Sequence, residues 1–137
     1  VPGLERVILM TFALSSLMKR DRSVWIANHL NQAFGQLSEG GRRAFKDHAE
    51  EFVARVAAVV TPDDLHPEVT PIDVGNMVWI TVHGCHLLSD AMMDDVIDRL
   101  ARSWQIMLCA MAPPDSLEYF EQFVVRTAKR YKVSGAA

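Results

Sequence analysis

The side chains best able to bind a metal ion lie together in the segment His83-Gly84-Cys85-His86. On a helix, His83 and His86 face the same side at i,i+3 spacing and form a possible pair of ligands. Structural zinc usually has four ligands with Cys-x-x-Cys or His-x(3–5)-His spacing, and the remaining candidates, His66 and Cys109, lie elsewhere in the chain. We therefore interpret the cluster as polar residues packed at a helix contact, and we predict no metal and no cofactor.

Common motifs of catalysis and nucleotide binding are missing from the sequence. There is no Gly-x-Ser-x-Gly nucleophile elbow. Gly40-Gly41 is followed by Arg42-Arg43 and not by the Gly-Lys-Ser/Thr of a phosphate-binding loop. The acidic pairs Glu50-Glu51 and Asp94-Asp95 indicate a solvated helix face and a helix start. We therefore do not expect an enzyme, and a metal-dependent enzyme built on His83 and His86 is the alternative in that class.

Adaptable apolar side chains are more frequent than packing alone requires, because the chain contains 7 Met, 3 Trp and 5 His. Soft apolar residues with a few polar tips are those that line small-molecule cavities. Each of these residues alone fits ordinary core packing, but together they indicate a cavity for a small molecule. The predicted ligand-binding residues are Met10, Trp25, Phe45, His48, Phe52, Trp79 and His83.

These residues fall on segments whose apolar positions recur with a helical period, and turn-forming residues separate the segments. The first segment is apolar on nearly all sides, which predicts a place in the middle of a bundle. On the third, Lys46–Glu50 and Glu51–Arg55 have the i,i+4 spacing of exposed ion pairs. No segment alternates like a strand, so we predict one all-α domain over residues 1–137, a six-helix bundle without a sheet. The six predicted helices are Leu4–Met18, Arg22–Phe34, Gly41–Val60, Ile72–Ser89, Met93–Met111 and Asp115–Tyr131.

The fourth segment has no Asp, Glu, Lys or Arg from Val74 to Leu88. An exposed helix does not tolerate that composition, so we expect both of its faces to be covered. Gly84 in its middle costs about 1 kcal/mol relative to Ala, and the close approach of another helix usually offsets this. We therefore predict a homodimer in which the fourth and fifth segments pair with their symmetry mates. The predicted interface residues are Thr81, Gly84, Cys85, Leu88, Trp104 and Leu108.

Composition limits the possible partners of the chain. With 137 residues, half of them hydrophobic, and a net charge of −3, the sequence predicts one soluble globular domain without the basic surplus that nucleic-acid binding needs. Its apolar runs are too short to cross a membrane. Two cysteines within helical segments do not form a disulfide framework, which favours a reduced, cytoplasmic setting. Because the chain begins Val-Pro-Gly-Leu, we expect it to be a piece of a longer protein.

The third to fifth segments resemble the ligand-binding domain of the TetR family of transcriptional repressors. Within that family the closest likeness is to the gamma-butyrolactone receptors of actinobacteria and their antibiotic-responsive relatives. Two features carry it in particular: an acidic linker before a helix with a Gly-x-x-x-x-Ser pattern, and a later helix that contains a Trp and stops at a proline. The resembling residues are Phe45–Val60, Asp63–Val69, Val78–Ser89, with Gly84 to Ser89 as the pattern, Arg99–Trp104 and Pro113-Pro114.

The resemblance implies a homodimer whose small hydrophobic effector binds among the helices and releases operator DNA. Operator DNA would be bound only through an N-terminal helix-turn-helix domain that this chain does not contain. Butyrolactone receptors carry a Trp where Phe45 aligns, so the effector expected here is a butyrolactone, a furan, a butenolide or an antibiotic-like molecule. The alternative is a helical dimerisation or interaction module that binds no small molecule.

Overall fold

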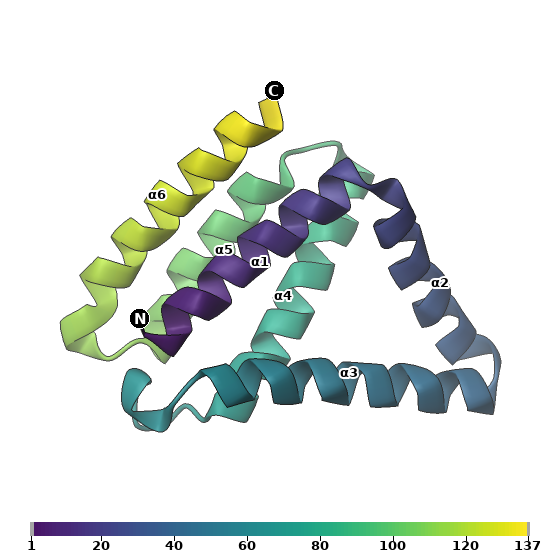
Figure 1. Cartoon of the computed structure of the whole chain (residues 1–137), viewed down its shortest axis with the longest axis horizontal. Helices are drawn as coiled ribbons and strands as arrows, with labels where there is room; N and C mark the ends of the chain where they lie inside the picture. Colours follow the sequence, from purple (N-terminus) through teal and green to yellow (C-terminus); the bar gives the residue numbers. More distant parts are fainter. Residues whose placement is uncertain (1, 137) are drawn as a thin grey trace.

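The computed structural model describes residues 2–136, without the side chains of residues 25, 28, 29, 31, 34 and 134–136. Within this range the chain is all-helical and has no strand, as predicted (Figure 1). Each of the six predicted segments corresponds to one α-helix, and two short 3-10 turns precede α4 and α6. The elements are α1 (Gly3–Arg20), α2 (Arg22–Leu37), α3 (Glu39–Val59), η1 (Pro62–Asp64), α4 (Pro71–Met92), α5 (Val96–Met111), η2 (Pro114–Ser116) and α6 (Leu117–Ala136).

The central helix is α1, which contacts each of the other five α-helices. On one side it packs with α5 and α6. On the other, α2 and α3 complete a triangle of which α1 is the third side, and α4 packs against both α3 and α5 (Figure 1). The position of α1 agrees with its composition, because both of its sides are apolar over most of its length. The molecule therefore has a closed half, α1 with α4 to α6, and an open half, α1 with α2 and α3.

The closed half is organised around Trp104 of α5, whose side chain is fully buried. Its indole Nε1 donates a hydrogen bond of 2.8 Å to Oγ1 of Thr11 on α1, and Thr11 in turn donates to the carbonyl oxygen of Ile8 at 2.7 Å. The prediction that Trp104 and Leu108 lie in a dimer interface is therefore wrong. Both side chains have no exposed surface because the apolar stripe of α5 packs inside the chain, where α1 covers it.

Helix starts follow from local side-chain chemistry. Thr70 and Asp73 form a reciprocal capping box at the start of α4, where Pro71 occupies the first helical position. The same bonds hold the pKa of the Asp73 carboxyl below its usual range, the backbone N–H of Thr70 contributing most. Asp95 caps α5 by accepting a 2.7 Å hydrogen bond from the backbone N–H of Ile97. These caps fix where α4 and α5 begin.

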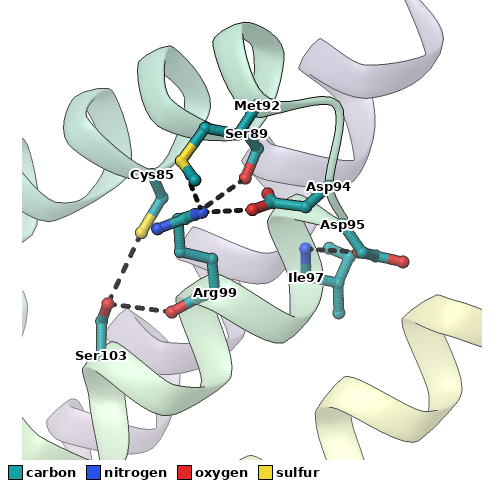
Figure 2. A network of polar contacts seen from close by, with 8 residues as sticks. All are labelled: Cys85, Ser89, Met92, Asp94, Asp95, Ile97, Arg99 and Ser103. Carbon is teal, nitrogen blue, oxygen red and sulfur yellow. Dashed lines mark hydrogen bonds and ion pairs between the residues drawn. The ribbon is translucent and has the colours of Figure 1, made fainter.

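The corner between α4 and α5 is fixed by one arginine (Figure 2). Arg99 of α5 reaches back to α4, where its Nε donates to Ser89 Oγ at 3.3 Å, and its guanidinium forms an ion pair with Asp94. Hydrogen bonds from Arg99, and one with Ser89, lower the pKa of the Asp94 carboxyl. The turn itself passes through Met93 in the left-handed region, with φ of 56°. The angle between α4 and α5 is thus set by polar contacts as well as by apolar packing.

Two glycines let helices approach α3 closely. A Cβ atom at Gly75 of α4 would lie 2.7 Å from the carbonyl oxygen of Val53, and one at Gly3 of α1 would collide with the carbonyl oxygen of Val59. Such separations leave no room for a side chain at either position. The C-terminal half of α3 is therefore held tightly against the starts of α1 and α4.

None of the helices in residues 2–136 combines the length and apolarity that a membrane crossing requires.

Ion pairs on the exposed side of α3 are those expected from its sequence. Arg55 Nη2 lies 2.6 Å from Glu51 Oε1, and Lys46 Nζ lies 3.8 Å from Glu50 Oε1. Both predicted pairs are confirmed.

Candidate functional site

A cavity of about 500 Å³ lies between α1 and α3 in the open half of the molecule. Its apolar lining comes from one face of each helix, because residues three or four apart share a helix face. This volume falls within the range of about 300–1,000 Å³ that is typical of small-molecule sites. The lining residues are Arg6, Val7, Met10 and Leu14 of α1 and Phe52, Arg55, Val56 and Val59 of α3.

The positions of the helix ends explain why this space is not filled. At one corner Gly3 places the start of α1 directly on Val59 at the end of α3. At the other ends of the two helices α2 lies between them, and its 16 residues keep them apart by roughly 24 Å of helix length (Figure 1). The two helices therefore diverge from the corner, and their facing apolar surfaces cannot close on each other.

An aromatic cluster adjoins the cavity, centred on Trp79 of α4. The Trp79 ring lies 5.1 Å from Phe52, 6.0 Å from Phe45 and 5.8 Å from His48, measured between ring centroids. His83, one turn further along α4, lies 4.0 Å from Trp79 by the same measure, and its Nδ1 is 2.8 Å from the Trp79 carbonyl oxygen. The cluster gives the junction of α3 and α4 an apolar surface with the polar edges of an indole and two imidazoles.

Six of the seven predicted ligand-binding residues lie in these two adjoining groups. Met10 and Phe52 line the cavity, whereas Phe45, His48 and His83 surround Trp79. Phe52 belongs to both groups and joins them. The side chain of Trp25 lies outside the described part of the chain.

The sequence prediction missed most of the residues that line the cavity itself. Val7, Leu14, Val56 and Val59 belong to apolar stripes that look like ordinary core, and only the divergence of α1 and α3 turns them into a cavity wall. Arg55 was assigned to the exposed face of α3, where it does pair with Glu51. Arg55 also lines the cavity, and no sequence pattern distinguishes these two roles.

The structure also contains a larger hollow of about 620 Å³ between α5 and α6. Five of its eight lining residues carry charged or amide side chains, namely Arg102, Gln105, Glu118, Glu121 and Gln122. The cavity between α1 and α3 is smaller, yet six of its eight lining residues are apolar. Because small-molecule sites are mostly apolar with a few polar groups, the cavity between α1 and α3 is the better candidate.

One face of α4 carries apolar side chains that the chain itself does not cover. Ile80 is 60% exposed and Leu88 is 47% exposed, and Met77 and Leu87 lie on the same face at helical spacing. A single chain therefore leaves one face of this helix uncovered, and its coverage by a second copy stays a prediction. We call the surface formed by Met77, Ile80, Leu87 and Leu88 the α4 stripe.

Among the other predicted interface residues, Thr81 and Gly84 are partly exposed, whereas Cys85 is buried against α5. Burial raises the pKa of the Cys85 thiol. Apart from the neighbouring backbone of α4 itself, no heavy atom of the described chain lies within 4 Å of the position that a Cβ atom at Gly84 would take. The close approach that we expected at this glycine is therefore not made within one chain. The prediction that Cys85 lies in the dimer interface is wrong, because its side chain is buried inside the chain.

The two histidines of the candidate metal cluster, both on α4, differ in their surroundings. The His83 ring packs against that of Trp79 at an interplanar angle of 40°, whereas His86 is 6% exposed. Burial, and to a lesser extent His83, lowers the pKa of His86 to about 4. Among the described residues, no three His, Cys, Asp or Glu side chains come together in a way that would hold a metal ion.

In comparisons with known proteins, no family model, curated protein or solved structure matches the chain.

Proposed function

We propose that the chain is the effector-binding and dimerisation domain of a TetR-like transcriptional repressor. A small hydrophobic molecule of the butyrolactone, furan, butenolide or antibiotic-like class binds between α1 and α3. In the intact repressor, a separate helix-turn-helix domain contacts the operator, and effector binding releases it. The observation that carries this proposal is the apolar cavity of about 500 Å³, which adjoins the aromatic cluster around Trp79.

The position of α1 supports a regulatory role for the cavity. A ligand shifts a conformational equilibrium only by binding two arrangements with different affinity. Val7, Met10 and Leu14 of α1 line the cavity, and α1 also contacts each of the other helices. A ligand that changes the separation of α1 and α3 therefore acts on α1, the helix that contacts all the others. Coupling between two sites typically amounts to about 1–3 kcal/mol.

The α4 stripe supports the dimer. Exposed apolar side chains in a row along a helix mark a protein interface. A second copy placed across a two-fold axis would bring the same residues, among them Ile80 and Leu88, onto each other. The open space over Gly84 allows the partner helix to approach closely there.

Calorimetric titration with γ-decalactone and 2-hexylfuran tests the effector cavity. We expect one of these probes to bind with one site per chain, and we expect Met10→Trp to abolish binding by filling the cavity. Leu9→Trp is the matched control, since Leu9 is on the same helix, is 37% exposed and does not line the cavity. Unchanged binding by Met10→Trp would contradict the site. Absence of binding by a stable dimer would favour the dimerisation module without a ligand.

Sedimentation analysis tests the dimer. We expect the wild-type chain to be dimeric and Ile80→Lys with Leu88→Lys to be monomeric. Replacing central interface residues usually costs at least about 2 kcal/mol, which raises the dimer Kd by roughly 30-fold or more. Leu37→Lys places the same charge on an apolar side chain that is 79% exposed at the end of α2 and should leave the dimer intact. A monomeric wild-type chain at high concentration would contradict the proposal.

A further inference from the structure

We propose that the molecule bound between α1 and α3 is an anionic amphiphile, with an aliphatic body and a carboxylate head group that Arg6 and Arg55 bind. This inference rests on the proposed function, because it specifies the chemistry of the same cavity. It narrows the proposed hydrophobic effectors to those that carry an acidic group, and neutral lactones and furans of the same size should bind more weakly. The observation behind it is the chemistry of the cavity wall.

The wall separates into an apolar part and a cationic part. Six lining residues are Val, Met, Leu or Phe, and the remaining two, Arg6 and Arg55, are both arginines. No Asp or Glu side chain is among the lining residues. An apolar site whose lining includes two arginines and no acidic residue is complementary to a molecule with an apolar body and one acidic end, although Glu51 competes for one of the arginines.

The two arginines lie at corresponding places on the facing helices. Arg6 is three residues after Gly3, and Arg55 is four residues before Val59, where Gly3 and Val59 form the corner at which α1 meets α3. Each arginine is therefore about one helical turn from that corner, on opposite sides of the cavity. A head group near that corner would therefore lie between the two long arginine side chains.

The guanidinium groups retain donors for such a head group. Arg55 donates from Nη2 to Glu51 Oε1 at 2.6 Å, which uses one of its five N–H donors. Within the described part of the chain, Arg6 forms no ion pair. A guanidinium matches the two oxygens of a carboxylate in a planar, bidentate arrangement and is only weakly hydrated, so it suits a site next to apolar surface.

Calorimetric titration with octanoate and octanamide isolates the charge, because the two probes differ only in their head groups. We expect octanoate to bind about tenfold more tightly, as one charge-assisted contact in a partly solvated site provides. In the double variant Arg6→Gln with Arg55→Gln, octanoate should bind no better than octanamide, while octanamide binding is unchanged. Glu51→Gln removes the group that competes for Arg55 and should strengthen octanoate binding about twofold.

Arg43→Gln is the matched control. Arg43 lies on the same helix, belongs to an equivalent i,i+4 pair with Glu39 at 4.0 Å and does not line the cavity. Octanoate should bind this variant as it binds the wild type. Equal affinity for both probes, or unchanged octanoate binding by the double variant, would overturn the head-group assignment. If octanamide and γ-decalactone bind but octanoate gains nothing, the cavity stands and only this inference fails. If none of the three probes binds, both proposals fail.

Discussion

The two halves of the molecule bury their apolar side chains to very different degrees. In the closed half, Trp104, Leu100 and Leu108 of α5 have no exposed surface, and neither does Phe12 of α1. In the open half, α3 is 21 residues long but buries only Val53 and Val56. The same helix, α1, serves both halves, with one side in the core and the other on the cavity. Stability is therefore concentrated in the closed half, and space for a ligand is concentrated in the open one.

This difference shows how one chain can hold both a stable core and an unfilled cavity. A cavity costs stability because its wall loses packing contacts. The closed half offsets that cost with a continuous apolar core and with the hydrogen bond from Trp104 to Thr11. Substitutions in the two halves should consequently differ in kind, those in the closed half affecting folding and those around the cavity affecting binding.

The largest expected effect is that of Trp104→Ala, which should lower the free energy of unfolding by about 3–5 kcal/mol, because it leaves a large void and removes a buried hydrogen bond. Phe52→Ala in the open half should cost only about 1 kcal/mol, since Phe52 is partly exposed beside an existing cavity. Urea denaturation measures both. If Trp104→Ala does not fold, Trp104→Phe should still cost about 1–2 kcal/mol. Equal losses for Trp104→Ala and Phe52→Ala would remove the distinction between the halves.

Acid should destabilise the closed half through His86. Because burial lowers the pKa of His86 from 6.5 to about 4, the unfolded chain takes up a proton between these pH values and the folded chain does not. The stability that comes from keeping His86 uncharged is therefore fully present above pH 6.5 and is lost as the pH falls toward 4. Between pH 7 and pH 4.5 the wild type should lose about 2 kcal/mol more than His86→Gln. Parallel pH profiles of the two proteins would show that His86 is not the titrating group.

Two glycines of α4 should respond in opposite directions to the same substitution. Gly75→Ala should lower stability by about 1–3 kcal/mol, because the new methyl group meets the Val53 backbone at 2.7 Å. Gly84→Ala should leave the free energy of unfolding unchanged or raise it by up to about 1 kcal/mol at low protein concentration, since no other part of the described chain lies within 4 Å of the new methyl group. Thermal melts compare them directly. A loss at Gly84 equal to that at Gly75 would contradict the packing described for α4.

The smallest expected effect is on the exposed side of α3. Glu50→Gln breaks the pair with Lys46, whose atoms are 3.8 Å apart on exposed side chains, and should change stability by less than about 0.5 kcal/mol. The change in stability caused by Glu50→Gln should be smaller still in 0.5 M salt, because exposed charges are screened. A loss above about 1 kcal/mol would show that this face is covered, for instance by a partner.

The helices were predictable because each contains its own signals. A proline at the start of α4, a capping Thr70 and an Asp95 before α5 are local features, and all act as local chemistry requires. The surface that covers the apolar stripe of α5 was not predictable in the same way. Trp104 and Leu108 form an apolar stripe that fits either a partner helix or the chain's own α1, and periodicity alone does not say which of the two covers it.

The candidate site was predictable to a similar degree. Aromatic and methionine content indicated a cavity, and Phe45, Phe52 and Trp79 do gather at one place. Arg6 and the valines of the wall were missed because the cavity depends on the angle between α1 and α3. That angle is set by close contact at Gly3 and by α2 at the other end, two features that are distant from each other in the sequence.

Methyl-resolved NMR of the Met-labelled chain, titrated with γ-decalactone and then with octanoate, tests the central claim most directly. Met10 lines the cavity, Met111 is buried in the closed half and Met77 lies on the α4 stripe, so the three methyl groups report on three places. The account predicts a saturable shift at Met10 with little change at Met111 and Met77. A shift at Met77 or Met111 with none at Met10 would contradict a ligand site between α1 and α3.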